Sequence, residues 1–413
     1  MSKKQIVILG GGFAGIYSAL SILEHAGTEA EITVISKHNY FLFTPMLHEV
    51  ATGGLGHHQV VESIREIIRK TPIRFFEATV ASVDLSKKEA VTDHGSFSYD
   101  YLIVALGATT NFFDTKGAAE HALVLKDLQG AIKLRSTIIE RFEAASRTTD
   151  PEKRREMLSF VIVGGGATGV ELAAEISEFT KRTLHKYYRR QFSENCTRIT
   201  LVQSAPELLP SFGPETRSRA HKSRIKKGVS VILSTKVNEV RKDAVVLAGG
   251  ASVPAGTVVW TAGVRPNMLE TAGGEFAKDS SSRIITDSAF RVKGAAHVYA
   301  LGDIAHVENA SERAYPMLAQ VAVAEAKHLG KNIARTMHGK PELPFVFKAE
   351  GELVSLGQWE AAGTIGKLNL YGKLAWFIWR TVYLFKFISR SKKLKIAVDW
   401  TIHLFFPRDV TRI

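Results

Sequence analysis

Cysteine is almost missing from this sequence. Cys196 is the one cysteine among 413 residues, so the chain can form neither an internal disulfide nor a C-x-x-C redox pair. This argues against disulfide reductases and sulfide:quinone reductases, both of which use cysteine pairs. We expect Cys196 to be a packed, unreactive thiol.

Long uncharged apolar runs are also missing. No stretch of about 18 residues is both apolar and free of charge, so we expect no membrane-spanning helix. The N-terminus passes directly from Lys3-Lys4 into an apolar strand and lacks the features of a signal peptide. The P-loop, G-x-S-x-G and H-E-x-x-H motifs are absent. His57-His58 has no companion cluster at metal-ligand spacing, and we therefore expect no bound metal.

The overall composition is that of a globular protein with a basic surface. Hydrophobic residues make up 45% of the chain and charged residues 23%, which is ordinary for folded domains. A length of 413 residues corresponds to two or three domains. The net charge of +13 favours anionic partners such as nucleic acid, membrane surfaces or anionic substrates.

The strongest feature that is present is an internal repeat. An apolar strand, a glycine turn and a helical pattern occur at residues 5–23 and again at residues 160–179. Both turns satisfy G-x-G-x-x-G, in which the glycines permit a tight turn, close approach of a pyrophosphate and close helix–strand packing. The helix N-terminus then offers amides to the diphosphate. The glycines are Gly10, Gly12 and Gly15 in the first copy and Gly164, Gly166 and Gly169 in the second.

Both copies sit between a strand and a helix, as the binding mechanism requires. A later apolar strand follows each copy and leads to a turn, at Gly107 in the first and at Gly263 in the second. The sequence therefore predicts an α/β protein with two Rossmann-like dinucleotide-binding domains. Because a flavin accepts a hydride and passes electrons onward, the expected pair of dinucleotides is FAD with NAD(P)H.

The acid that usually binds a ribose hydroxyl is missing from both copies. Ser36 stands at this position in the first copy and Gln203 in the second. A neutral glutamine does not repel a 2′-phosphate as a carboxylate does. We therefore expect NADPH to be tolerated beside NADH.

Beyond these general motifs, the chain resembles the type II NADH:quinone oxidoreductases, the non-pumping respiratory NADH dehydrogenases. The resemblance runs nearly end to end. It rests most specifically on Phe41-Leu42-Phe43-Thr44-Pro45-Met46-Leu47 combined with the tail, and it also includes segments 49–53, 300–303, 319–320, 374–380 and 399–409. It implies that the first domain binds FAD and the second binds NADH.

The resemblance implies a discontinuous FAD-binding domain, because Gly302-Asp303 lies beyond the second repeat. The expected division is residues 1–112 and 285–345 for FAD, 113–284 for NAD(P)H, and 346–413 for a C-terminal membrane-associated helical segment.

Site residues follow from the motifs and the resemblance. The residues expected to bind FAD are Gly10, Gly12, Gly15, Ser36, Lys37, Pro45, Gly107, Gly302 and Asp303. Those expected to bind NAD(P)H are Gly164, Gly166, Gly169, Gln203 and Gly263.

Two residues are expected to take part in catalysis. The family's glutamate matching Glu171 lies near the nicotinamide and flavin, where it relays protons; the alternative is an acid that complements the helix dipole. The family also carries Ala-Gln-x-x-x-Gln at the quinone site. Gln320 is present, and an amide there can donate to a quinone carbonyl. The second amide is replaced by Ala324, which puts quinone affinity or headgroup preference in doubt.

The tail is aromatic and basic. Residues 371–388 hold seven aromatic side chains interrupted by Lys373, Arg380 and Lys386. This pattern suits a helix lying in the membrane interface, with basic groups on anionic lipid. We expect residues 368–406 to dock on the cytoplasmic face of the membrane as a peripheral anchor. A helix packed against its own domain or against a homodimer partner is the alternative.

The resulting hypothesis is a flavoprotein that passes a hydride from NADH to FAD and two electrons to a membrane quinone, without pumping protons. Two rival functions stay open: reduction of a small electron-carrier protein, and a redox-sensing binding protein with slow turnover. We expect no nucleic-acid partner, since large aliphatic residues are interleaved with the aromatic residues of the tail.

Replacing Gln203 with glutamate tests the prediction about NADPH. A carboxylate at this position repels the 2′-phosphate, so the ratio of kcat/KM for NADPH over NADH should fall by about tenfold or more in Gln203→Glu. Steady-state kinetics with both nucleotides measure it. An unchanged ratio contradicts the prediction.

Overall fold

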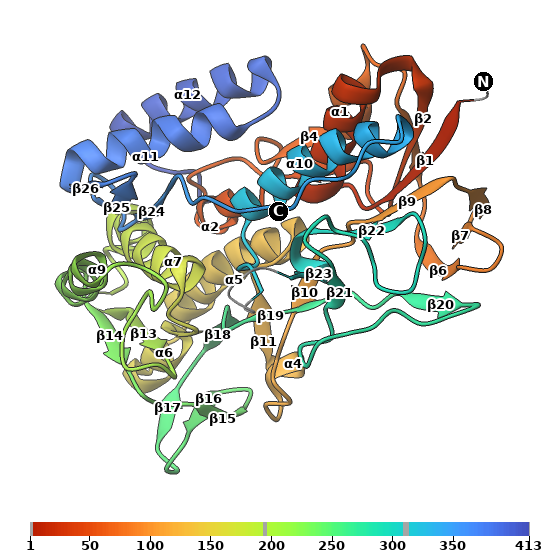
Figure 1. Ribbon diagram of the computed structural model, residues 1–413. Helices are drawn as coiled ribbons and strands as arrows, with labels where there is room; N and C mark the ends of the chain where they lie inside the picture. The colour runs from red at the N-terminus through yellow and green to blue at the C-terminus, as the bar shows by residue number, and fades with distance from the viewer. Residues whose placement is uncertain (1–2, 193–195, 309–313, 413) are drawn as a thin grey trace. The chain divides into compact units, whose positions relative to one another are not determined.

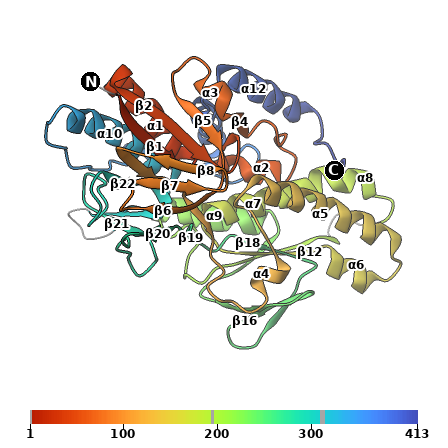
Figure 2. The ribbon, with the colours of Figure 1, turned by 90° about the vertical axis from the view of Figure 1, so that its right-hand side faces the viewer.

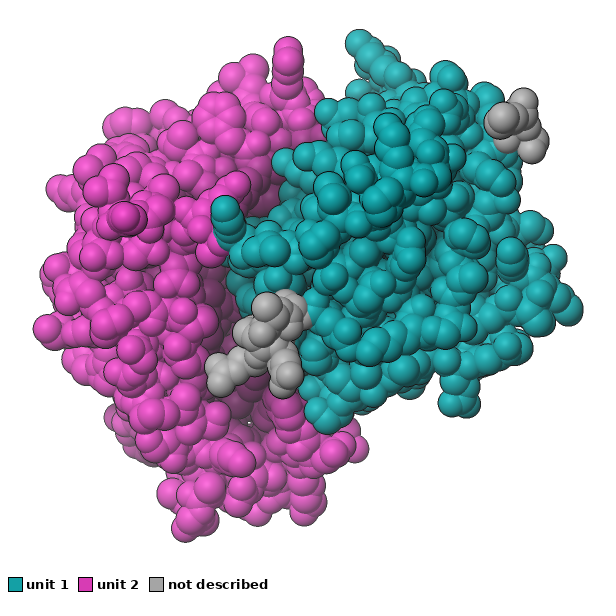
Figure 3. Space-filling model, in the orientation of Figure 1, with its two compact units in different colours: residues 1–42, 61–109, 264–348 teal, residues 43–60, 110–263, 349–413 magenta. Residues whose placement is uncertain are grey.

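The computed structural model describes residues 3–192, 196–308 and 314–412, with two compact units (Figures 1 and 3). Unit 1 comprises residues 1–42, 61–109 and 264–348, and unit 2 comprises residues 43–60, 110–263 and 349–413. Both units are therefore discontinuous in the sequence.

Unit 1 is built on a five-stranded parallel sheet with the order β22-β9-β1-β2-β5. Its strands are β1 (Lys4–Leu9), β2 (Ala30–Ser36), β5 (Arg74–Glu77), β9 (Tyr101–Val104) and β22 (Val298–Ala300). The central strands are buried nearly throughout, as expected for a parallel sheet covered on both faces.

Helix α1 (Phe13–Ala26) packs along α10 (Ala319–Met337) beside this sheet (Figures 1 and 2). The two backbones approach closely at Gly330, where an added Cβ would lie 2.3 Å from the Ser21 hydroxyl. That hydroxyl donates to the Lys327 carbonyl oxygen at 3.1 Å. This helix pair joins the first repeat to a segment 300 residues later in the chain.

Unit 2 is built on a second five-stranded sheet, which repeats four strands of the first and differs in the origin of the fifth. Its order is β11-β18-β12-β13-β14, and all of its neighbours are parallel. The strands are β11 (Ala122–Val124), β12 (Ser159–Val163), β13 (Arg198–Val202), β14 (Val229–Ile232) and β18 (Thr257–Trp260). Helix α7 (Ala167–Glu178) follows the second glycine turn as α1 follows the first. The fold is therefore the predicted α/β fold with two Rossmann-like halves.

Smaller elements surround both sheets. In unit 1 these are β3 (Tyr40–Leu42), β4 (Val61–Ser63), α3 (Ile64–Ile68), β6 (Val80–Asp84), β7 (Glu89–Thr92), β8 (Gly95–Ser98), β20 (Glu270–Ala272), β21 (Ile284–Thr286) and β23 (Ala305–Val307). In unit 2 they are α2 (Leu47–Val50), α4 (Ala118–His121), α5 (Leu128–Arg147), α6 (Pro151–Met157), α8 (His185–Tyr188), α9 (Pro214–Lys226), β15 (Val237–Val240), β16 (Ala244–Leu247) and β17 (Ser252–Pro254).

The expected domain boundaries differ from these units in three long segments, besides shifts of three residues at 110–112 and at 346–348. Residues 43–60 belong to unit 2, because α2 packs on α5 and α7. Residues 264–284 belong to unit 1, because β20 pairs with β6. Residues 349–413 belong to unit 2 instead of forming a separate segment, because the backbone N–H of Ser355 donates to Glu171.

The C-terminal segment begins as a sheet and ends as two helices. The antiparallel strands β24 (Gly351–Ser355), β25 (Ala361–Ile365) and β26 (Leu368–Tyr371) precede α11 (Gly372–Lys386) and α12 (Arg390–Phe405). The two helices lie side by side (Figure 1). Within the described residues, no helix has both the length and the apolar character that crossing a membrane requires.

Candidate functional site

The glycine turn of unit 1 is defined by two close contacts and one open position. Gly10 has φ +119°, and an added Cβ would lie 2.2 Å from the Ala105 carbonyl oxygen. At Gly15 an added Cβ would lie 1.8 Å from the Gly10 carbonyl oxygen. At Gly12, by contrast, a Cβ would meet no described atom within 4 Å. The outer two glycines therefore let strand and helix meet, and the middle one faces open space.

The turn of unit 2 has the same geometry. Gly164 has φ +112°, and an added Cβ at Gly169 would lie 1.9 Å from its carbonyl oxygen. Gly166 again faces open space. Gly12 and Gly166 stand at the N-caps of α1 and α7, and neither helix has a side-chain cap among the described residues. At such a helix N-terminus the first backbone N–H groups have no side-chain partner, and the glycine leaves space beside them. This arrangement fits the binding of a diphosphate.

The residues at the ribose positions lie against these turns. Ser36 ends β2 and is buried, and an added Cβ at Gly11 would lie 2.8 Å from its hydroxyl oxygen. Gln203 follows β13, and its Oε1 accepts a hydrogen bond from the Gly165 N–H at 3.1 Å. That bond leaves the amide –NH₂ as a donor. Lys37, the neighbour of Ser36, is exposed.

The remaining predicted residues divide between the units. Gly107 (φ +68°), Gly302, Asp303 and Gln320 lie in unit 1. Pro45, Glu171 and Gly263 lie in unit 2. Gln320 is half-buried in the first turn of α10. Gly263 lies against the Phe113 ring, which an added Cβ would approach to 2.7 Å.

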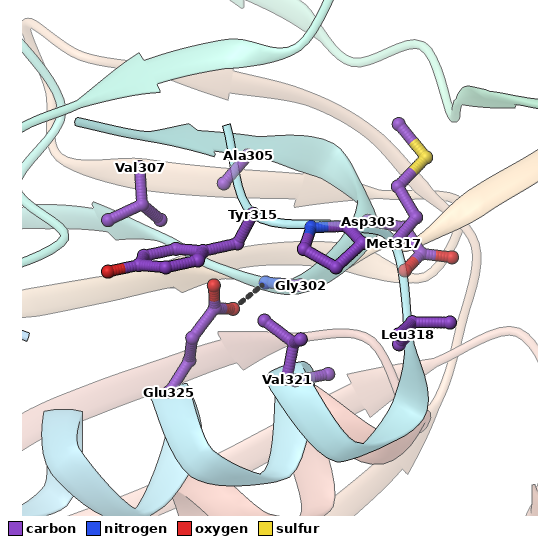
Figure 4. Close-up of a pocket in the computed structure, with 11 residues that line it drawn as sticks. Gly302, Asp303, Ala305, Val307, Tyr315, Met317, Leu318, Val321 and Glu325 are labelled. Atoms are coloured by element: carbon purple, nitrogen blue, oxygen red, sulfur yellow. Dashed lines mark hydrogen bonds between the residues drawn. The ribbon is translucent and has the colours of Figure 1, made fainter. Parts of the chain in front are cut away.

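A buried carboxyl group that sequence reasoning missed lies beneath Gly302. Glu325, on the same helix as Gln320, is 2% exposed, and its Oε2 accepts the Gly302 N–H at 2.7 Å (Figure 4). Burial raises the pKa of Glu325 to about 8; the Gly302 N–H lowers it and neighbouring Asp303 raises it. The pocket above it is also lined by Ala305, Val307, Tyr315, Pro316, Met317, Leu318, Val321 and Ala322. The burial of Glu325 could not be predicted from the sequence, because helical periodicity does not indicate which polar residue of a helix faces the interior.

Unit 2 holds a second buried cluster, around Glu171. His48 of α2 and Glu171 of α7 are 2% and 7% exposed, and Nδ1 of His48 lies 3.7 Å from Oε2 of Glu171. Oε1 of Glu171 accepts the Ser355 N–H at 3.0 Å. Burial raises the pKa of Glu171, and the nearby His48 and the Ser355 N–H oppose that rise.

Glu175, one turn further along α7, pairs with the C-terminal tail. Its Oε2 accepts hydrogen bonds from Nη1 of Arg408 at 2.6 Å and from the Thr52 hydroxyl at 3.2 Å. Burial alone would raise the pKa of Glu175, but the charge of Arg408 lowers it below the ordinary value. In the same cluster, Trp400 Nε1–H donates to Glu49 at 2.8 Å. Glu171 and Glu175 are four residues apart on α7, yet they contact different partners: His48 and Ser355 for Glu171, and Arg408 and Thr52 for Glu175.

His48 and Arg408 were not predicted as functional residues. His48 lies between segments 41–47 and 49–53, which carry the resemblance to the family. Arg408 lies in segment 399–409, for which the resemblance implied no catalytic role. The sequence offered one indication of their importance, which was their position within or next to segments that resemble the family. Their partners lie more than 120 residues away along the chain, so local spacing could not identify them.

Two family models match the chain. The pyridine nucleotide-disulphide oxidoreductase model covers residues 4–326. The NDH2 C-terminal domain model covers residues 350–409, the segment that contains β24 to β26, α11 and α12.

The chain is also similar to individual NADH dehydrogenases along nearly its whole length. A probable NADH dehydrogenase of Dictyostelium discoideum is 34% identical, covering 100% of this chain and 92% of that protein. A type II NADH:quinone oxidoreductase of Mycobacterium tuberculosis is 30% identical, covering 98% of this chain and 89% of that protein. The solved structure of NDH2 from Plasmodium falciparum in complex with NADH matches with a TM-score of 0.92 at 21% identity, covering 99% of this chain and all of that one; this last match concerns the fold.

Paired alanine substitutions in the first turn separate packing from cofactor binding. Gly15→Ala forces a Cβ onto the Gly10 carbonyl and should destabilise the protein by about 1–3 kcal/mol or more. Gly12→Ala adds a methyl group in open space, so the melting temperature of the flavin-free protein should stay close to wild type while FAD affinity falls by about tenfold or more. Differential scanning fluorimetry and FAD titration measure the two effects. Equal losses of stability in both variants would contradict this assignment.

Substituting Glu325 tests its raised pKa. A carboxyl with a raised folded-state pKa contributes its full stability below its unfolded pKa, and that contribution is lost as pH rises towards about 8. Glu325→Gln cannot lose a proton, so its melting temperature relative to wild type should rise between pH 5 and pH 9, by about 4 °C or more. Glu24→Gln, at an exposed glutamate of α1, is the control and should show a constant difference. A constant difference for Glu325→Gln as well would refute the raised pKa.

Proposed function

The chain belongs to the type II NADH:quinone oxidoreductases, and we propose that it oxidises NADH through bound FAD and reduces a membrane quinone. The observation that carries this proposal is the duplicated diphosphate cradle. Two parallel sheets share the arrangement of four strands, β9-β1-β2-β5 in one and β18-β12-β13-β14 in the other. In each sheet a glycine turn leads into a helix N-terminus that has no side-chain cap among the described residues. When bound, FAD supplies the group that accepts the hydride and releases electrons to the quinone.

The turn of unit 1 would hold the FAD diphosphate, with Gly12 facing it and Ser36 and Lys37 near the ribose. Gly302 and Asp303 would hold the ribityl region, with Gly107 and Pro45 as further contacts. Glu325 would fix Gly302 through the hydrogen bond to its N–H.

The turn of unit 2 would hold the nicotinamide nucleotide. Gly166 faces the diphosphate, and Gln203, held by the Gly165 N–H, presents its –NH₂ group to the ribose. An amide donor is compatible with a hydroxyl or with a 2′-phosphate, which supports use of NADPH beside NADH. Gly263 would border the nicotinamide end.

Glu171 and Gln320 are the proposed catalytic residues. Oxidation of NADH releases one proton fewer than reduction of a quinone consumes, so each turnover takes up one proton. Glu171 is buried and its pKa is raised, which suits a carboxyl that holds and releases a proton. Gln320 would donate its amide to a quinone carbonyl. With Ala324 in place of a second amide, one hydrogen bond fewer orients the headgroup.

The C-terminal helices carry the proposed membrane contact. Leu374, Phe377 and Phe385 recur at helical spacing on α11, and Leu394, Val398, Ile402 and Phe405 recur on α12; all of them are exposed. An apolar stripe flanked by basic groups such as Lys373 and Arg390 fits an anionic membrane interface. We place this contact on the cytoplasmic face, as a peripheral association.

One residue of the expected membrane surface needs a correction. Arg380 was expected to face anionic lipid. Its guanidinium instead lies 4.0 Å from the centroid of the Trp376 ring and 4.7 Å from that of Trp400. A cation between two indole faces is stabilised by their π systems. Arg380 therefore joins α11 to α12 and does not contribute to the exposed basic surface.

The rival functions have less support. Electron-carrier reductases share the nucleotide-binding fold, but the NDH2 C-terminal domain match covers the tail that would distinguish them. A redox sensor of slow turnover would not require the exposed stripe of α11 and α12.

An absorption spectrum tests the proposed function directly. The purified protein should be yellow, its visible flavin absorption band should bleach on adding NADH without oxygen, and the band should return on adding a soluble quinone analogue. A sensor would bleach once without sustained turnover. Protein that binds no flavin would refute the proposal.

Charge substitutions on α12 test the membrane contact. Phe405 and Leu394 are 78% and 68% exposed. The double variant Leu394→Glu/Phe405→Glu should bind vesicles that contain anionic phospholipid at least about tenfold more weakly, with turnover of a soluble quinone analogue unchanged. Met268→Glu, at a site that is 75% exposed in unit 1, is the matched control and should bind as wild type does. If the double variant instead keeps its vesicle binding and changes from dimer to monomer by light scattering, the stripe is a dimer interface.

A further inference from the structure

His48 has an arrangement that the proposed roles of other residues do not explain. Its imidazole is 2% exposed, and one ring nitrogen, Nδ1, faces Glu171 at 3.7 Å. The other ring nitrogen, Nε2, is buried and has no hydrogen-bond partner among the described residues. Burying a polar atom without a hydrogen-bond partner destabilises the folded protein. Buried polar groups in folded proteins are nearly always paired, so the exception needs an explanation.

The Glu171 carboxylate is held in place for an interaction with His48. The Ser355 N–H binds Oε1 at 3.0 Å, which leaves Oε2 directed to the imidazole. A separation of 3.7 Å is too long for a hydrogen bond but short enough for a strong charge interaction in a buried site. A carboxylate on one side of an imidazole, with the other ring nitrogen turned to a reactant, is the arrangement in which histidine acts in general acid–base catalysis.

Among the described residues, His48 is the one basic group that forms an ion pair with Glu171. The neighbouring acids are matched separately: Glu175 by Arg408, and Glu49 by Trp400 Nε1–H together with the charge of nearby Arg380. The other neighbours that interact with Glu171 are Arg224 of α9, which donates to the carbonyl oxygens of Val170 and Leu356, and Tyr383 of α11. His48 is therefore the titratable base that faces Glu171 most closely.

We propose that His48 and Glu171 hold one exchangeable proton between them and that Nε2 of His48 gives this proton to the quinone. The inference rests on the proposed NADH:quinone activity. In the overall reaction, NADH, one proton and the quinone give NAD⁺ and the quinol. The two electrons and one proton come from NADH. The second proton comes from His48: its Nε2–H bond breaks, an O–H bond forms on the quinone oxygen, and water returns a proton to the neutral imidazole.

The experiment separates the two halves of the reaction by anaerobic stopped-flow spectroscopy. In His48→Gln, bleaching of the flavin by NADH should keep its rate within about twofold, because hydride transfer needs no added proton. Its reoxidation by a soluble quinone analogue should slow by about 100-fold and lose its dependence on pH between 6 and 9. His185→Gln is the matched control, because His185 of α8 also has a buried ring nitrogen without a described partner. It should behave as wild type in both halves.

The outcomes distinguish this inference from the function on which it rests. If wild-type protein neither bleaches with NADH nor recovers with quinone, the proposed function fails. If wild type completes the cycle and His48→Gln keeps the wild-type reoxidation rate and pH profile, the role of His48 is overturned.

Two further measurements cover the case in which His48→Gln does not fold. Reoxidation of the wild-type protein should be at least about twofold slower in D₂O, with the NADH step unaffected, and no isotope effect would overturn the proposal. Glu171→Gln, which preserves shape, should lose the same pH dependence of reoxidation. Where both variants fold, the double variant should be no slower than the slower single variant, since residues that act as a unit are not additive.

Discussion

The whole arrangement depends on a backbone contact that admits no side chain. In both units the last glycine of the turn meets the carbonyl oxygen of the first, so closely that a Cβ would lie within 2 Å of it. This contact brings the N-terminus of α1 over the end of β1, and that of α7 over the end of β12. Everything a diphosphate needs, including directed amides, a favourable helix dipole and open space at the middle glycine, follows from that approach. The same glycine contact recurs in both units, next to four strands that are arranged in the same way.

Electrostatic neutralisation is the second constraint, and it is specific to unit 2. Four glutamates, Glu49, Glu171, Glu175 and Glu178, are buried there, and buried carboxylates are tolerated only when paired or protonated. Arg408 and Trp400 come from the tail to satisfy two of them. The tail also contacts the loop that follows α2, where Gln59 donates to Asp399 and Lys392 donates to the His58 carbonyl. The C-terminal tail therefore supplies side chains to the buried glutamate cluster of unit 2.

The sequence predicted the parts of the fold that repeat locally. Strand–turn–helix periodicity marked β1, α1, β12 and α7, and the glycine spacing identified both cradles. The packing of segment 43–60 was not predictable, since apolar periodicity shows that a segment is buried but not against which unit. The same limit explains Glu325 and His48, whose environments are set by partners distant in the chain. Arg380 was misjudged for a related reason, because a basic residue in an aromatic helix has the same pattern whether it faces lipid or lies between two indole rings.

The contact between Thr52 and Arg408 spans 356 positions of the chain. Unit 1 has all of its strands once residue 348 has been synthesised, whereas Glu175 gains its counter-ion only when translation reaches residue 408. During biosynthesis all segments of unit 1 are therefore available before unit 2 can balance the charge of Glu175. A nascent chain interrupted in α12 would hold every strand of unit 1 but would leave Glu175 of unit 2 buried without its counter-ion, and such an unbalanced charge favours the unfolded state of that unit.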